Sequence, residues 1–260
     1  IDCLYDSIMD VPQLHWLLNP GGKWAQRGFA IGMFFIPFGF ALYKDIKSEK
    51  QISQPKSKVP EKKEHLVVDL GDFEFEKEAG GVVAGVDEAG RGPWAGPVVA
   101  GAVVIADRNL PEELLTGLDD SKKLSAAKRE KLYSALLAAE KAGKLSIGIG
   151  EATAREIDEM NILQATFLAM RRAVAKLKVC PEKALIDGNR VPKDFPCPCR
   201  TIVKGDARSM SIAAASIAAK VYRDRLMADL ARKYPGYGFE KNAGYGTVLH
   251  QAGLAEKGIC

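Results

Sequence analysis

The sequence contains few of the residues that bind zinc or build disulfide frameworks. Its 260 residues include only three histidines and five cysteines. The cysteines are odd in number and irregular in spacing, which does not fit a disulfide framework. Cys197 and Cys199 form a close pair, but a structural zinc site needs a second pair of ligands in register with the first. We therefore expect no zinc site, and at least three free thiols as in a reducing compartment.

The chain also lacks the glycine-rich loops of the common nucleotide-binding folds. Neither GxGxxG nor GxxxxGK[ST] occurs in it, so a nucleotide-binding loop of these types is not supported. The formal net charge of +4 is compatible with a polyanionic partner, but many proteins without such a partner share it. Hydrophobic residues make up 47% of the chain and charged residues 27%. This composition suits a well-buried domain and excludes a chain that is disordered throughout.

The sequence divides into three parts. Residues 1–43 form an N-terminal extension with an uncharged run at 28–43, which is shorter than the about 20 residues of a membrane helix. This run predicts either a membrane tether or an unstructured segment. A cleaved signal peptide is not favoured, because polar sequence precedes the run. Residues 44–80 are a charged linker and lead-in, and residues 81–260 have the pattern of a globular domain.

Short apolar runs alternate with segments of helical spacing in residues 81–260. Valine-rich or alternating patterns predict strands at 82–87, 97–106, 145–152, 184–188 and 200–206. Helical spacing predicts helices at 121–144, 153–178 and 209–234. Ser125 is the expected N-cap of the first helix and Gly143 its expected stop. The order of the elements predicts an α/β fold whose first two strands pair as a hairpin-like unit.

Acidic residues stand at the ends of three of the predicted strands. Asp87 and Glu88 end the first strand, Asp187 ends the fourth and Asp206 ends the fifth. If these strand ends converge, four carboxylates repel one another and raise each other's pKa, which divalent cations such as Mg²⁺ or Mn²⁺ would offset. Two such ions can activate a water and stabilise the leaving oxygen of a phosphodiester. A single acid after a strand is more often a turn residue or a helix cap, and spacing alone leaves that alternative open.

Two further segments have the composition of phosphate or sugar contacts. The turn Gly90-Arg91-Gly92 leaves backbone amides open, and its arginine can fork onto a phosphate. Lys122 and Lys123 stand at the start of a predicted helix, where they are either a phosphate contact or a solvated helix end.

Aromatic residues also occur in glycine-rich loops near the end of the chain. Tyr245 stands between two glycines. A tyrosine in such a loop either stacks on a base or sugar or packs beneath the loop.

Taken together, these segments resemble the ribonuclease HII family, the bacterial type 2 RNase H. Matching segments occur in the family's order over about 180 residues, at 83–104, 120–125, 184–189, 203–224 and 234–247. Type HIII enzymes carry a lysine where this chain has Arg91. The resemblance implies an RNase H-like fold with a central mixed sheet flanked by helices. It also implies endonucleolytic cleavage of the RNA strand of RNA–DNA hybrids, and at single ribonucleotides embedded in duplex DNA, with 5′-phosphate and 3′-hydroxyl products.

The resemblance assigns roles to individual residues. Those that match the family's catalytic, metal-binding acids, which take Mn²⁺ or Mg²⁺, are Asp87, Glu88, Asp187 and Asp206. Gly90, Arg91 and Gly92 match the tripeptide that recognises the 2′-hydroxyl at the junction between ribonucleotide and DNA. Tyr245 matches the tyrosine that packs on the deoxyribose at that junction. Lys122 and Lys123 match a segment that contacts phosphate.

The chain departs from the family in two places. Asn242-Ala243 stands where the family usually has His-Lys, and this change is expected to weaken substrate binding. The chain also ends at Cys260, short of the family's usual basic C-terminal segment, as expected of a truncated C-terminus. We expect a cytoplasmic monomer that binds nucleic acid and no protein partner, with membrane association through residues 28–43 as the alternative. Another RNase H-like nuclease and an inactive hybrid-binding module are the competing functional hypotheses.

Overall fold

The computed structural model describes residues 73–118, 121 and 123–260. The apolar run at 28–43, most of the charged segment 44–80, and Lys122 lie outside these residues. Within the part of the chain that the structure describes, no helix is long and apolar enough to cross a membrane.

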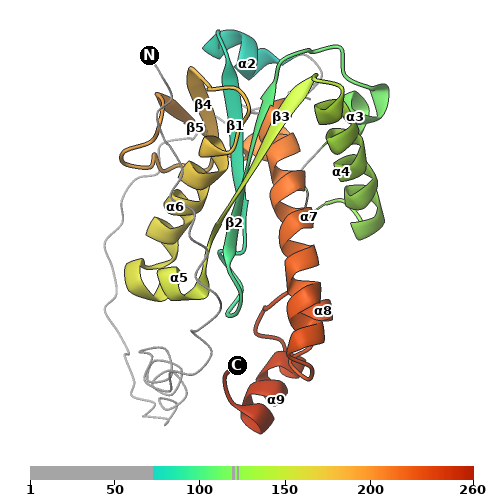
Figure 1. Cartoon of the computed structure of the whole chain (residues 1–260), viewed down its shortest axis with the longest axis vertical. Helices are drawn as coiled ribbons and strands as arrows, with labels where there is room; N and C mark the ends of the chain where they lie inside the picture. The colour runs from blue at the N-terminus through green and yellow to red at the C-terminus, as the bar shows by residue number, and fades with distance from the viewer. Residues whose placement is uncertain (1–72, 119–120, 122) are drawn as a thin grey trace, which may run out of the picture. The chain divides into compact units, whose positions relative to one another are not determined.

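A five-stranded mixed sheet forms the centre of the domain (Figure 1). The strands lie in the order β3-β2-β1-β4-β5, and their bounds are β1 Val83–Ala89, β2 Val98–Ile105, β3 Leu145–Ala152, β4 Lys183–Asp187 and β5 Cys199–Ile202. β1 and β2 pair antiparallel, as the predicted hairpin-like unit requires, and so do β2 and β3. β4 pairs parallel with both β1 and β5. This arrangement confirms the predicted α/β fold.

Helices cover both faces of the sheet. Their bounds are α2 Glu74–Ala79, α3 Glu112–Gly117, α4 Ala126–Lys141, α5 Ala154–Met160, α6 Ile162–Ala175, α7 Met210–Lys233, α8 Phe239–Asn242 and α9 Val248–Lys257. Helices α4 and α7 build one core with the β2 side chain Val103. Helix α6 builds a second core with Val86 and Ile186 on the other face, and Figure 1 shows α6 and α7 on opposite sides of the sheet.

Small residues let α7 lie directly on the sheet. A methyl group built on Gly85 of β1 would lie 2.2 Å from the backbone carbon of Ser211 in α7. A methyl group built on Gly101 of β2 would lie 2.4 Å from the carbonyl oxygen of Ala215. Because real methyl groups do not approach so closely, larger residues at these positions would push the helix off the strands.

Two predicted elements are wrong in their bounds. The predicted helix 153–178 is two helices, α5 and α6, because Asn161 adopts a φ of 73° between them and its side chain caps α6 through the amides of Leu163 and Gln164. The predicted strand 200–206 ends at Ile202, because the chain turns at Lys204 (φ 56°) into a 3-10 turn at Gly205–Ala207. The predicted helix 121–144 begins only after its N-cap Ser125 and ends before Gly143, as those two residues predict.

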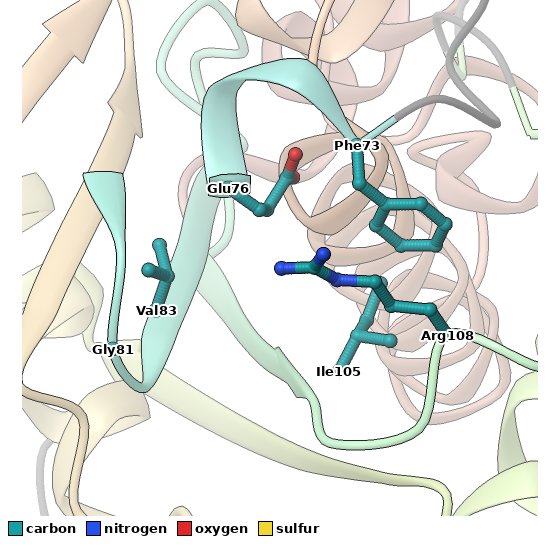
Figure 2. A pocket seen from close by; sticks show the side chains of 6 residues that line it. All are labelled: Phe73, Glu76, Gly81, Val83, Ile105 and Arg108. Atoms are coloured by element: carbon teal, nitrogen blue, oxygen red, sulfur yellow. The ribbon is translucent and has the colours of Figure 1, made fainter. Parts of the chain in front are cut away.

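Helix α2 binds the start of α7 through a buried glutamate. Oε1 of Glu76 accepts hydrogen bonds from the hydroxyls of Ser209 and Ser211, both at 2.6 Å, and from the Ser211 amide at 2.9 Å. The side chain reaches into a small pocket of about 20 Å³, which Arg108 lines from another segment (Figure 2). Part of the predicted lead-in therefore packs against the domain.

Replacing Glu76 by alanine is expected to lower the free energy of unfolding by about 3 kcal/mol, because three buried donors lose a charged acceptor. Urea unfolding would measure the loss. Glu78→Ala is the matched control on the same helix, since Glu78 is 58% exposed and pairs with the exposed Arg200. Such a pair contributes at most about 1 kcal/mol. Equal losses in the two variants would contradict the role assigned to Glu76.

Candidate active site

The register of β1 and β4 brings two of the predicted acids side by side. Val86 pairs with Ile186 in the parallel ladder, so Asp87 and Asp187 follow at matching positions. Val86 and Ile186 belong to the core under α6. Because successive strand residues point to opposite faces, both aspartates point to the other face, which α7 covers.

Asp87 is a buried carboxyl beside other carboxyls. It is 4% exposed, and burial raises its pKa well above the usual range, with further increases from the neighbouring charges of Glu88 and Asp187. Hydrogen bonds from the Ser216 hydroxyl and from the Glu88 amide, at 2.7 Å, act in the opposite direction but are the smaller effects. Carboxylates this close together favour a bound positive charge, and a divalent cation supplies one.

Glu88 and Asp206 approach the same strand ends from other directions. Glu88 follows Asp87 on the strand and so points to the opposite face, where it accepts an ion pair of 3.1 Å from Arg91. Asp206 is buried in the 3-10 turn after β5 rather than at a strand end. The amide of the preceding Gly205 donates a 2.7 Å hydrogen bond to Oδ1 of Asp187.

The donor set suits a hard cation. Oxygen ligands are those that Mg²⁺ and Mn²⁺ prefer, whereas zinc prefers nitrogen and sulfur. Among the described residues, no group of three acidic, histidine or cysteine side chains is close enough as it stands to hold an ion. The acids come from two faces of one strand, a neighbouring strand and a turn, so side-chain rotation would have to bring them onto a common ion.

The thiols take no part in this donor set. Cys197, Cys199 and Cys260 are free, as expected. Burial raises the pKa of Cys197 to about 11, so its thiol stays protonated at neutral pH. Metal binding by cysteine requires the thiolate.

A pocket of about 60 Å³ opens beside the acids. It is lined by Glu88, Arg91 and Asp187, by the turn Gly188–Arg190, and by side chains of α6. Asn189 and Arg190 are exposed at this turn. Asn189 ends the segment 184–189 that carries the family resemblance, and Arg190 follows it; neither was predicted as a site residue.

The predicted turn 90–92 and the predicted Tyr245 lie against each other, although they are far apart in sequence. A methyl group built on Gly92 would lie 3.3 Å from Cε1 of Tyr245. The tyrosine is 51% exposed, so it packs over the turn rather than beneath a loop. Gly90 has a φ of 105°, and a methyl group there would lie 2.3 Å from Nε of Arg223. Glycine is therefore required at position 90 by both conformation and space.

Arg223 of α7 holds these two loops together, and it was not predicted. Its side chain is 2% exposed. Its guanidinium donates hydrogen bonds to the carbonyls of Pro97 (3.0 Å) and Ala95 (3.1 Å), and to that of Ala243 (2.9 Å). The loop after β1 and the loop that carries Tyr245 thus share one buried cation.

Asn242 also fixes the Tyr245 loop. It is buried, its Nδ2 donates to the carbonyl of Tyr237 at 2.7 Å, and its Oδ1 accepts from the amide of Gly244 at 2.8 Å. A residue that departs from the family pattern therefore has a structural role here.

The predicted phosphate segment is linked to Asp87 through two serines. Ser121 is buried, and its hydroxyl lies 2.8 Å from that of Ser216, the residue that hydrogen-bonds Asp87. Lys123 is exposed two residues further on, while Lys122 lies outside the described residues.

Comparisons with known proteins identify relatives for most of the chain. The family model described as Ribonuclease HII matches residues 84–260. The chain is 57% identical over 189 residues to ribonuclease HII of Granulibacter bethesdensis, covering 73% of this chain and 84% of that protein. It is 58% identical to ribonuclease HII of Rhodospirillum rubrum, covering 73% and 85%. The fold resembles the crystal structure of ribonuclease H2 from Pyrococcus horikoshii, with a TM-score of 0.53 and 35% identity, over 65% of this chain and 82% of that one.

Proposed function

This chain belongs to the ribonuclease HII family and is an endoribonuclease that cleaves the RNA strand of RNA–DNA hybrids, and we propose that it also cleaves at single ribonucleotides embedded in duplex DNA. The observation that carries the proposal is the contact between Gly92 and Tyr245. It places the turn assigned to the 2′-hydroxyl beside the side chain assigned to the adjacent deoxyribose. A site that reads both sugars at once recognises one ribonucleotide followed by DNA.

The four acids are proposed to hold two divalent cations, Mg²⁺ or Mn²⁺. Asp87 and Asp187 lie at adjacent strand ends, Glu88 follows Asp87, and Asp206 follows the glycine that hydrogen-bonds Asp187. When bound, such ions supply activation of the attacking water and stabilisation of the charge on the departing 3′-oxygen. The products would carry 5′-phosphate and 3′-hydroxyl ends.

The remaining residues bind and orient the substrate. Arg91 and the amides of Gly90 and Gly92 would contact the 2′-hydroxyl, with Arg91 oriented by its ion pair with Glu88. Tyr245 presents a half-exposed ring to the next sugar, on which a deoxyribose packs without a hydroxyl in the way. Lys122 and Lys123 would contact backbone phosphates.

Three substrates test the proposal: an RNA–DNA hybrid, a DNA duplex with one ribonucleotide, and the same duplex without it. Each is incubated with Mg²⁺, with Mn²⁺, and with EDTA. We expect the first two to be cut in at least one metal, the all-DNA duplex to stay intact, and EDTA to abolish cleavage because the acids then lack their cations. Cleavage of the all-DNA duplex would indicate a different RNase H-like nuclease. Binding without cleavage in either metal would indicate a hybrid-binding module.

A further inference from the structure

Trp94 is a large exposed side chain that the proposed function leaves unused. It is the tryptophan of the loop after β1, three residues beyond Arg91, and it is 59% exposed. A single exposed hydrophobic residue is ordinary on a protein surface, so exposure alone carries no argument. The geometry that holds this one in place is what distinguishes it.

The backbone around Trp94 is tied to the Tyr245 loop. The amides of Trp94 and Ala95 both donate to the carbonyl of Gly244, at 2.9 and 3.2 Å. Arg223 fixes the same loops through the carbonyls of Ala95 and Ala243. The backbone that carries the indole is therefore held by hydrogen bonds to the Tyr245 loop and to Arg223. Fixing the indole against a ligand would then cost little conformational entropy.

One side of the indole ring packs on the protein. A methyl group built on Gly246 would lie 2.4 Å from Cε2 and Cζ2 of Trp94. The ring centroids of His250 and Trp94 are 6.1 Å apart. Nδ1 of His250 lies 3.0 Å from the carbonyl oxygen of Tyr245. The exposed remainder of the ring is thus offered to solvent next to the loop that carries the half-exposed Tyr245.

The chemistry of a duplex limits what such a ring can touch. Bases in an intact duplex are stacked on one another, so a flat side chain meets the apolar faces of sugars and the edges of the groove. The 2′-hydroxyl lies in the wide minor groove of an RNA-containing helix. Residues beside the turn that reads this hydroxyl therefore lie over the same groove.

We propose that Trp94 is a second aromatic contact with the substrate duplex, packing against a minor-groove sugar next to the nucleotide under Tyr245. This inference rests on the proposed function, because it takes the position of the duplex from Arg91 and Tyr245. It adds a contact that extends the binding surface along the groove.

Tryptophan fluorescence tests the contact directly. In the full chain carrying Trp16→Phe, Trp24→Phe and Asp187→Asn, Trp94 is the remaining tryptophan. Titration with a duplex containing one ribonucleotide is expected to change the intensity and wavelength of its emission. Anisotropy of the labelled duplex shows when binding is saturated. Saturation without any change in Trp94 emission would overturn the proposal.

Kinetics of single variants give the second readout. Trp94→Ala is expected to raise KM for the ribonucleotide-containing duplex about tenfold with little change in kcat, as for the loss of one aromatic contact. Trp94→Phe should recover part of that loss. Val179→Ala is the control. Val179 is exposed and precedes β4, whereas Asp187 lies at the other end of that strand. An unchanged KM in Trp94→Ala would overturn the proposal, whereas a wild-type chain that cuts no ribonucleotide-containing duplex would overturn the proposed function itself.

Discussion

An Asp187→Asn variant is expected to bind an RNA–DNA hybrid with nearly unchanged affinity and to cleave it about a thousandfold more slowly, or not at all. Asp187 stands beside the buried Asp87, and removing its charge removes one of the acids that attract a divalent cation. Asparagine keeps the oxygen that accepts the Gly205 amide, so the turn that carries Asp206 should be preserved. Anisotropy of a labelled hybrid and single-turnover cleavage would separate binding from catalysis.

Asp194→Asn provides the matched control in the same connection between β4 and β5. Asp194 is exposed and has a φ of 56°, a conformation that asparagine tolerates well. This variant should cleave like the wild type. Full activity in Asp187→Asn would remove Asp187 from the catalytic site, and calorimetric titration with Mn²⁺ alone would show whether the change also weakens metal binding.

The positions of Asp87 and Asp187 at adjacent strand ends were predictable because strand periodicity is a strong signal. An apolar run that ends in an acid places the acid at the end of a strand, and a parallel pair of strands places two such acids together. Asp206 was misplaced because the apolar residues Ile202 and Val203 extend the strand pattern past the point where the chain turns. The positive φ at Lys204 that ends the strand is set by the tertiary structure, and a lysine gives no local sign of it.

The break between α5 and α6 was missed for a similar reason. Apolar residues continue at helical spacing on both sides of Asn161, which hides the interruption. The local sign was nevertheless present, because asparagine both tolerates a positive φ and caps helices well. Here it does both, accepting from the amides of Leu163 and Gln164 at 3.0 and 3.2 Å.

Arg223 was missed although helix periodicity marks it. Ala215, Ala219, Arg223 and Met227 follow one another at intervals of four and are all buried, so they form one stripe of α7. A charged residue on a buried stripe requires partners. What the sequence does not supply is their identity, since the carbonyls of Ala95, Pro97 and Ala243 come from two loops that are distant in the chain.

Arg223→Met is therefore expected to lower the free energy of unfolding by at least about 3 kcal/mol, because three carbonyls lose their buried donor. That loss is a large part of the about 5–15 kcal/mol by which a domain is stable. Cleavage at a single ribonucleotide, measured below the melting temperature, should fall about a hundredfold, since the turn at 90–92 and Tyr245 would no longer be held in register. Calorimetry and cleavage assays on the same preparation would measure the two effects.

Arg225→Met separates the buried clamp from the general effect of removing an arginine from α7. Arg225 lies two residues further along the helix and pairs with Glu130 at 2.5 Å, but about half of each of these two side chains is exposed. An exposed pair of this kind contributes at most about 1 kcal/mol, so this variant should keep most of its stability and its cleavage.

If Arg223→Met matched Arg225→Met in both measurements, the two loops would have to be held by their own hydrogen bonds. These are the bonds from the amides of Trp94 and Ala95 to the carbonyl of Gly244. Because those bonds join backbone to backbone, they fix the spacing of the loops but leave the carbonyls around Arg223 unpaired, which is why we expect the arginine to be needed.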